Sequence, residues 1–139
     1  MYDTVVVGAD ESPTAAKAVA AAIELAALSG GTLHIVTAYK PATRSATGVP
    51  PEFAGSVQPD SHAQSLLADL ASRARASGVN VETHAHSGDP ADAITSTADR
   101  LGADLIVVGS KGMQRRVLGS VPHSIAHGAG CAVLVVKTD

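Results

Sequence analysis

The sequence has little of several residue types that mark other classes of protein. Its 139 residues include one cysteine, no tryptophan, two tyrosines and one phenylalanine. A single cysteine, Cys131, excludes an intramolecular disulfide and any zinc site within one chain that needs two cysteine ligands. With so few aromatic side chains, alanine and branched aliphatic residues must build the core. We therefore expect a protein of a reducing compartment, the cytoplasm, with helices packed closely on a sheet.

Long apolar runs and a strong charge of either sign are also lacking. No apolar stretch approaches the ~20 residues that span a bilayer, and Met1-Tyr2-Asp3 does not supply the basic region of a signal peptide. The net charge of -3 gives no overall attraction to nucleic acid or to an anionic membrane. The sequence thus predicts neither partner, and any anion site must be local.

Apolar residues recur in short runs and at helical spacing, which predicts one α/β domain over residues 1–139. Thr4-Val5-Val6-Val7-Gly8 is typical of a strand buried on both faces of a parallel sheet. Ser12-Pro13 supplies the cap and first-turn proline of a helix that ends at Gly30-Gly31. The alternation continues, giving expected strands at 4–8, 33–39, 79–86, 105–108 and 132–136, and helices at 13–29, 63–77, 90–101 and 120–129.

This alternation predicts a doubly wound, Rossmann-like fold, a five-stranded parallel sheet with helices on both faces. In such sheets ligands bind outside the carboxyl ends of the strands, where the strand order reverses. The loops that start at Gly8 and Gly109 are therefore the expected binding loops.

Residues 40–59 interrupt the pattern, with four prolines and two glycines and no helical or strand periodicity. We expect a mobile surface loop there. The alternative is a lid in which Phe53 or Arg44 covers a ligand.

Residues 109–120 combine glycine, small hydroxyl and basic residues directly after a predicted buried strand. Gly109 and Gly112 would let backbone N–H groups turn toward an anion, and Ser120 would open the positive end of the next helix. Lys111, Arg115 and Arg116 would add charge. A helix terminus alone offers only ~0.3–1 kcal/mol to an exposed anion, which favours a whole nucleotide over free phosphate. The alternative is that the glycines only shape a tight connection.

Taken together, these patterns resemble the universal stress proteins of the adenine-nucleotide α-hydrolase-like superfamily, over essentially the whole chain. The resemblance rests on Val5-Val6-Val7-Gly8-Ala9-Asp10-Glu11-Ser12, Gly88-Asp89-Pro90, Gly109-Ser110-Lys111-Gly112 with Gly119-Ser120, and Ala132-Val133-Leu134-Val135-Val136-Lys137. It implies the strand order 3-2-1-4-5. It also implies a homodimer in which the fifth strands, Ala132–Val136, meet edge to edge.

The resemblance further implies the ligand and its contacts. ATP-binding members hold adenine and ribose at the positions that match Gly8, Ala9, Asp10 and Ala38, with Asp10 contacting the ribose or the adenine. The phosphates would lie at the glycine segment, formed by Val108, Gly109, Ser110, Lys111, Gly112, Arg115, Arg116, Gly119, Ser120 and Val121.

The chain departs from the family's ATP motif in one spacing. Only the six residues 113–118 stand between Gly112 and Gly119, where the family motif has nine, so nearly one helical turn is missing. ATP is the first expectation. Cyclic AMP or AMP is the alternative, because a single phosphate fits a shorter loop better. Mg²⁺ would arrive with ATP through its phosphate oxygens, with Asp10 or Ser110 in outer contact.

Sequence motifs for catalysis are lacking: the chain has no Gly-x-Ser-x-Gly elbow, P-loop or Gly-x-Gly-x-x-Gly fingerprint. Asp10 and Glu11 are adjacent, which points their side chains apart and argues against a paired acid and base. Cys131, at the start of an apolar strand, is typical of a packed small residue.

Two histidine pairs, His84 with His86 and His123 with His127, share faces of predicted elements but lack an evident third ligand. We therefore expect no dedicated metal site. The sequence predicts a nucleotide-binding regulatory protein of stress adaptation. A slow ATPase and a dimeric interaction module that binds no nucleotide remain as alternatives.

Overall fold

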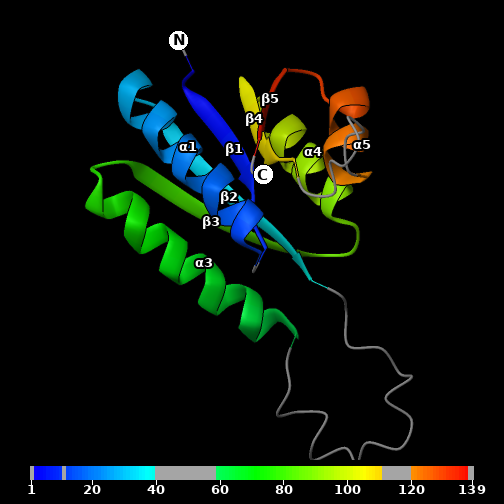
Figure 1. Ribbon diagram of the computed structural model, residues 1–139, viewed down its shortest axis with the longest axis horizontal. Coiled ribbons are helices and arrows are strands. Elements are labelled where there is room, and N and C mark those ends of the chain that lie inside the picture. Colours follow the sequence, from blue (N-terminus) through cyan, green and yellow to red (C-terminus); the bar gives the residue numbers. More distant parts are fainter. Residues whose placement is uncertain (1, 11, 40–58, 111–119, 138–139) are drawn as a thin grey trace, which may run out of the picture.

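The computed structural model describes residues 2–10, 12–39, 59–110 and 120–137, and it confirms the predicted fold class. All strand pairings in the sheet are parallel, and the strand order is β3-β2-β1-β4-β5, as the resemblance implied (Figure 1). The elements follow one another as β1 (Thr4–Gly8), α1 (Pro13–Ser29), β2 (Thr32–Tyr39), α3 (Pro59–Ala76), β3 (Asn80–Ser87), α4 (Pro90–Leu101), β4 (Leu105–Gly109), α5 (Ser120–Gly128) and β5 (Ala132–Val136).

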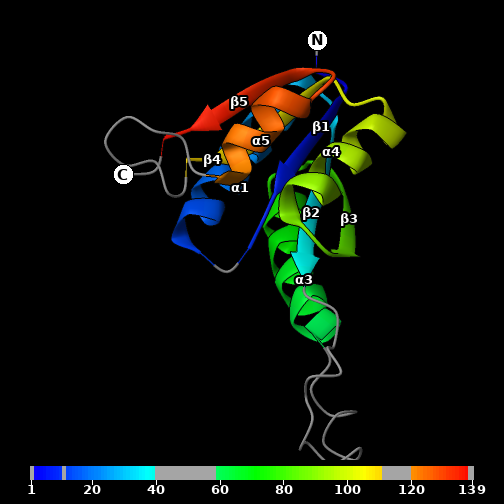
Figure 2. The same ribbon diagram turned by 90° about the vertical axis from the view of Figure 1, so that its right-hand side faces the viewer.

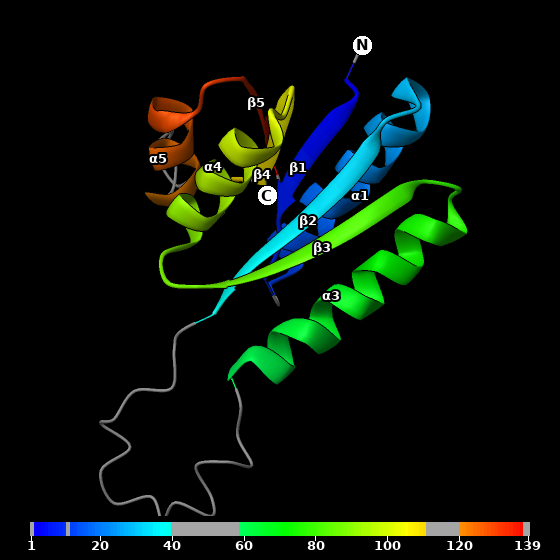
Figure 3. The same cartoon turned by 180° about the vertical axis from the view of Figure 1, so that it is seen from behind.

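Helices cover both faces of this sheet, α1 and α3 on one side and α4 and α5 on the other (Figures 1 and 3). Successive residues of a strand point to opposite faces, so Val5 and Val7 pack under α1 while Val6 packs on the side of α4. Both faces of β1 are thus buried, which explains its unbroken β-branched run. Alanines of α1 and α4 let these helices approach the sheet closely, as expected for a core poor in aromatic residues.

Most predicted boundaries agree with the structure to within a residue or two, but α3 begins earlier than its apolar pattern. The prediction placed its start at residue 63, whereas the helix begins at Pro59. Residues 59–62 are a proline followed by three polar residues, so apolar periodicity gives no helical signal there. Proline fits the first turn of a helix because its missing N–H would have no partner there anyway. The expected loop therefore loses Pro59 to α3, and its remaining residues, 40–58, lie outside the described ones.

Strands β3 and β5 form opposite edges of the sheet, and β1 lies in its centre (Figure 2). The start of β1 is tied to β4 through Asp104. One oxygen of this carboxylate, Oδ2, accepts hydrogen bonds from the backbone N–H groups of Asp3 and Thr4, each at 3.0 Å. The N–H of Asp104 donates in turn to the carbonyl of Thr4 at 2.9 Å. Among the described helices, none is both long and apolar enough to cross a membrane.

Candidate functional site

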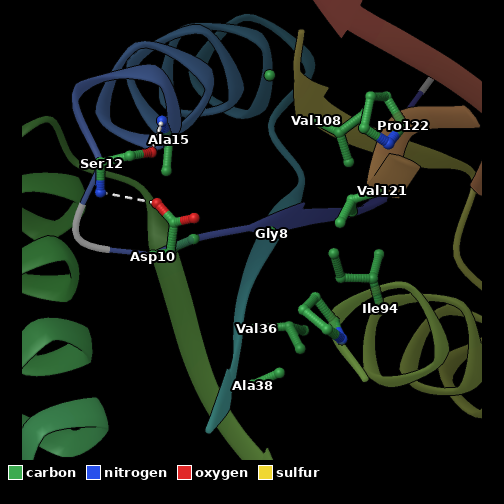
Figure 4. A pocket seen from close by; sticks show the side chains of 13 residues that line it. Gly8, Asp10, Ser12, Ala15, Val36, Ala38, Ile94, Val108, Val121 and Pro122 are labelled. Atoms are coloured by element: carbon green, nitrogen blue, oxygen red, sulfur yellow. Dashed lines mark hydrogen bonds between the residues drawn. The ribbon is translucent and has the colours of Figure 1, made fainter. Parts of the chain in front are cut away.

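A pocket of about 370 Å³ opens at the carboxyl ends of β1, β2 and β4, between the first turns of α4 and α5 (Figure 4). Here the strand order reverses, because β1 connects through α1 to β2 on one side and pairs with β4 on the other. Its volume lies within the usual range of small-molecule sites, roughly 300–1,000 Å³. The pocket therefore lies where a doubly wound sheet is expected to bind a ligand.

The loop after β1 is held to β2 before it reaches the pocket. The N–H of Ala9 donates to the carbonyl of Val36 at 2.9 Å, and the buried hydroxyl of Thr37 donates to the carbonyl of Ala9 at 2.8 Å. Both backbone polar groups of Ala9 are thus satisfied inside the sheet. The chain therefore leaves the sheet at the next residue, Asp10.

Asp10 is fixed by a local turn at the rim of the pocket. Its Oδ1 accepts a hydrogen bond from the backbone N–H of Ser12 at 2.7 Å (Figure 4). The hydroxyl of Ser12 accepts in turn from the N–H of Ala15 at 3.2 Å and caps α1. Ser12 therefore begins the helix and orients the carboxylate at the same time.

Helix α4 reaches the pocket because a three-residue turn sets its start. Gly88 has φ of 115°, a value that L side chains rarely adopt, and its N–H donates to the carbonyl of Tyr39 at 3.0 Å. Asp89 then caps the helix by accepting from the N–H of Asp92 at 3.0 Å. The next residue, Pro90, lines the pocket together with Ile94, one turn further on. The motif Gly88-Asp89-Pro90 thus positions the first turn of α4, which forms one wall of the pocket.

Strand β4 and helix α5 close the remaining side. Val108 and Gly109 line the pocket from the strand, and Val121 and Pro122 line it from the first turn of α5 (Figure 4). The N–H of Ser110 continues the ladder to the carbonyl of Val136 at 2.9 Å. The pocket therefore has an apolar wall on each side of the sheet's central strand.

The structure brings many of the predicted site residues together. Four of them line the pocket from β1, its loop and β2, namely Gly8, Ala9, Asp10 and Ala38, and three more do so from β4 and α5, namely Val108, Gly109 and Val121. Ser110 is buried at 2% exposure and is not among the described residues that line the pocket. Ser120 is the first residue of α5. Five predicted phosphate contacts lie outside the described residues: Lys111, Gly112, Arg115, Arg116 and Gly119. Whether these residues contact a ligand stays a prediction.

The structure also adds lining residues that the sequence did not single out: Ser12, Ala15, Val36, Pro90, Ile94 and Pro122. Three of them carried a usable signal in the sequence. Ser12 was the predicted helix cap next to Asp10, Pro90 belongs to the motif Gly88-Asp89-Pro90 of the family resemblance, and Val36 lies two residues before Ala38 on the same face of β2. Ile94 carried none, because an isoleucine at helical spacing is equally typical of the core.

The wall is largely apolar, and Asp10 is the ionisable group among its described lining residues. Apolar side chains of β2, α4 and β4 face one another across the cavity: Val36, Ala38, Ile94 and Val108 (Figure 4). Such a site suits a flat, weakly polar group held between aliphatic side chains, with a carboxylate at the rim to accept a hydrogen bond.

The histidine pairs do not form a metal centre in the described part of the chain. The ring centroids are 6.4 Å apart for His84 and His86 and 4.5 Å apart for His123 and His127. No group of three histidine, cysteine or acidic side chains there is arranged to hold a metal ion. Cys131 is half-buried, and desolvation, followed by the charges of Asp99 and Asp104, raises the pKa of its thiol. A thiol with a raised pKa is a poor nucleophile.

Comparisons with known proteins agree on one family. The sequence profile of the Universal stress protein family matches residues 1–137. The chain is 34% identical to the universal stress protein YxiE of Bacillus subtilis, over 99% of this chain and 100% of that one. Two solved structures are similar throughout. A universal stress protein in complex with cAMP has 36% identity and a TM-score of 0.78, with 99% of each chain covered. The universal stress protein of Archaeoglobus fulgidus in complex with dAMP has 26% identity and a TM-score of 0.75, with 98% of each chain covered.

Proposed function

Because the chain belongs to the universal stress protein family, we propose that it binds an adenine nucleotide in the pocket between β1, β2, β4, α4 and α5. We propose further that the bound nucleotide regulates a cytoplasmic response to stress and is not turned over as a substrate. The geometry of the pocket carries the proposal. An aliphatic slot of about 370 Å³ ends at a carboxylate that a backbone N–H holds in place.

Adenosine fits the chemistry of this slot. The base would lie between Ile94 of α4 and the residues of the sheet, Val36 and Ala38, where its flat faces lose water to apolar partners. Asp10 at the rim would accept a hydrogen bond from a ribose hydroxyl or from the adenine amino group. A charge-assisted bond of this kind contributes about 1.5–3 kcal/mol.

The proposal also concerns how many phosphates the bound nucleotide carries. The resemblance to the family implied ATP as the first expectation, but the spacer between Gly112 and Gly119 is three residues shorter than in the family's ATP motif. Two similar proteins hold cAMP and dAMP, each with one phosphate. We therefore propose a nucleotide with a single phosphate as the preferred ligand, bound near the N-terminus of α5 and the predicted basic residues. ATP with Mg²⁺ is then the weaker ligand.

A regulatory binder fits the pocket better than an enzyme. Asp10 is the ionisable group among the described lining residues, and its Oδ1 already accepts the N–H of Ser12. Rapid phosphoryl transfer needs a positioned water or base opposite a cation that stabilises the leaving group. We expect ATP turnover to be slow at most.

We propose that the protein forms a homodimer in which the β5 strands of two copies pair. This strand pairs only with β4 in the described chain, so its other side presents a strand edge. Leu134 on β5 is 39% exposed, one of two large hydrophobic side chains that are exposed among the described residues. Pairing with β5 of a second copy would cover both the edge and this side chain.

Mass spectrometry of small molecules released from the purified, denatured protein tests the function directly. We expect AMP or cAMP, and in calorimetric titrations both should bind more tightly than ATP with Mg²⁺. Ala38→Leu should fill the slot and weaken binding roughly ten- to hundredfold, the cost of about 1–3 kcal/mol of overpacking. Ala68→Leu, on the exposed face of α3, is the matched control and should bind as the wild type does. Absence of binding for all three nucleotides would overturn the proposal.

A further inference from the structure

Three histidines lie on the face of the sheet that α4 covers. His34 of β2 is buried at 5% exposure, and its Nδ1 lies 3.0 Å from Nε2 of His84 on β3. The ring of His86, two residues along β3, is parallel to that of His84 within 4°. We call His34, His84 and His86 the histidine cluster.

This cluster lies beside the residues of β2 that line the pocket. In the parallel register of β2 and β3, His84 lies opposite Val36 and His86 lies opposite Ala38. Val36 and Ala38 are the residues by which β2 lines the pocket. Neighbouring strands are about 4.8 Å apart, so His84 and His86 are the nearest neighbours of these two lining residues on the side of β3.

The cluster also contacts the helix that forms the other wall. Nε2 of His86 lies 3.3 Å from the hydroxyl of Thr97, a buried residue of α4. Thr97 lies one turn after Ile94, whose side chain lines the pocket. A change at the cluster therefore acts on the helix that presents Ile94 to the ligand.

The contact between His34 and His84 depends on protonation. One of the two facing nitrogens must lack a proton to accept the hydrogen bond, so a doubly protonated pair turns two N–H groups toward each other. Desolvation lowers the pKa of both rings, and the charge of Arg100 on α4 lowers both further. His34 and His86 lower the pKa of His84, whereas Glu82, whose Oε2 is 3.9 Å from Nε2 of His34, opposes the shift for both rings. The neutral pair is thus the form that fits the packed sheet and helix.

We propose that protonation of both His34 and His84 loosens the packing of α4 on this edge of the sheet and thereby weakens nucleotide binding. The proposal rests on the proposed function, since it concerns the same pocket. When both rings are charged, Glu82 can offset the charge at Nε2 of His34, but Nδ1 of His34 and Nε2 of His84 face each other as two donors and lose their hydrogen bond. The two rings then separate or take up water, which displaces α4 from the sheet. Ile94 then moves with the helix. By linkage, a nucleotide that needs the packed helix binds the deprotonated protein more tightly and releases protons when it binds.

Protonation of the cluster also has an effect of opposite sign on the binding of a nucleotide. A positive cluster attracts an anionic phosphate, which by itself would strengthen binding as the pH falls. Adenosine carries no phosphate charge, so its affinity reports the wall alone. AMP reports both effects together with the titration of its own phosphate, whose second pKa is about 6.

The experiment titrates adenosine and AMP into the full-length protein at pH 7.5 and pH 5.5. We expect the affinity of adenosine to fall about tenfold at the lower pH, within the usual range of coupling between two sites. His84→Gln keeps a polar partner for His34 but does not titrate. The affinity of this variant for adenosine should change less than threefold between the two pH values. His62→Gln, on the exposed part of α3 across the sheet, is the matched control and should behave as the wild type does.

A second measurement needs no ligand. The NMR signal of the Ile94 Cδ1 methyl group should shift with pH in the wild type and in His62→Gln, but not in His84→Gln. If this methyl group titrates as expected but no adenine ligand binds at any pH, the proposed function is wrong and the linkage falls with it. If adenosine binds with the same affinity at both pH values, or if His84→Gln keeps the full change, only the proton linkage is wrong. If His84→Gln unfolds at pH 5.5, the wild-type methyl titration decides: a methyl signal independent of pH overturns the proposal.

Discussion

The side chain of Ile94 lies over Gly8 so closely that a β-carbon at Gly8 would collide with the Cδ1 methyl of Ile94. The glycine that ends β1 thus lets α4 approach the central strand, at the point where both residues line the pocket. Gly8 has no positive φ that would demand a glycine. Space for Ile94 is the reason that a side chain is disfavoured there.

Gly8→Ala should therefore displace Ile94 and lower the free energy of unfolding by about 1 kcal/mol, the low end of the overpacking range, because the displaced atom is the end of a side chain that can turn. Ile94→Val removes the colliding methyl group, at a cost of about 0.5–1.5 kcal/mol by itself. The double variant should be more stable than the sum of the two single effects predicts. Urea unfolding of all three variants measures this coupling. Gly128→Ala, where a β-carbon meets no atom within 4 Å, is the control, and strict additivity would contradict the expected collision.

Asp10→Ala should weaken AMP binding roughly ten- to hundredfold, because a hydrogen bond to a charged group contributes about 1.5–3 kcal/mol. Asp10→Asn keeps an oxygen for the N–H of Ser12 and separates the loss of charge from the loss of the turn. Titration with 2′,3′-dideoxy-AMP distinguishes the two candidate contacts. If Asp10 contacts the ribose, the dideoxy ligand should lose little from Asp10→Ala. An equal loss for both ligands would assign Asp10 to the adenine.

Stability should fall below neutral pH through His34 and His84. Their pKa values are lowered from 6.5 in the folded protein, chiefly by desolvation. The unfolded chain then binds more protons below pH 6.5, so their contribution to stability is complete above pH 6.5 and is lost as the pH falls toward the lowered values. Urea unfolding from pH 7.5 to 5 measures the slope. A double variant, His34→Asn with His84→Gln, should show a flatter profile, whereas an equal slope would contradict the assignment because the carboxylates are common to both proteins.

Leu134→Lys should convert the proposed dimer to a monomer without unfolding the chain. The side chain is 39% exposed on β5, so the folded monomer accepts a charge there, but two lysines facing each other across paired strands repel. Sedimentation velocity measures the mass. Leu28→Lys removes the other exposed large hydrophobic side chain of the described residues, which is 85% exposed on α1, and should remain dimeric. A wild-type monomer, or a dimer that persists in Leu134→Lys, would exclude β5 as the interface.

Local signals were sufficient to predict most of the fold. The ends of α1 and α4 are marked by residues typical of helix termini. Ser12 and Asp89 cap the first turns, and Gly30 and Gly102 end the helices with positive φ. The start of α3 at Pro59 was missed, since its first turn adds only a proline and polar residues and so extends no apolar period. The strand order came from the resemblance to the family. Alternating strands and helices predict parallel pairing but do not say which strands are neighbours.

The candidate site was predictable where the chain itself turns, at Gly8 to Asp10 and at Gly109. Its opposite wall was not, because the role of Ile94 depends on how α4 crosses β1, which no local pattern records. The contact of His34 with His84 was missed for the same reason. The sequence indicated that His84 and His86 share a face, but His34 reaches them only through the pairing of β2 with β3.

The hydrogen bonds from Asp3 and Thr4 to Asp104 join residues about one hundred positions apart. On the ribosome, β1 emerges first but acquires its β4 neighbour only after β2, β3 and α4 have been made. Until then the central strand has one open edge, which is a template for pairing with other chains. A nascent or truncated chain that ends before Asp104 thus needs a chaperone more than the finished protein does, and the pocket is among the last parts of the molecule to form.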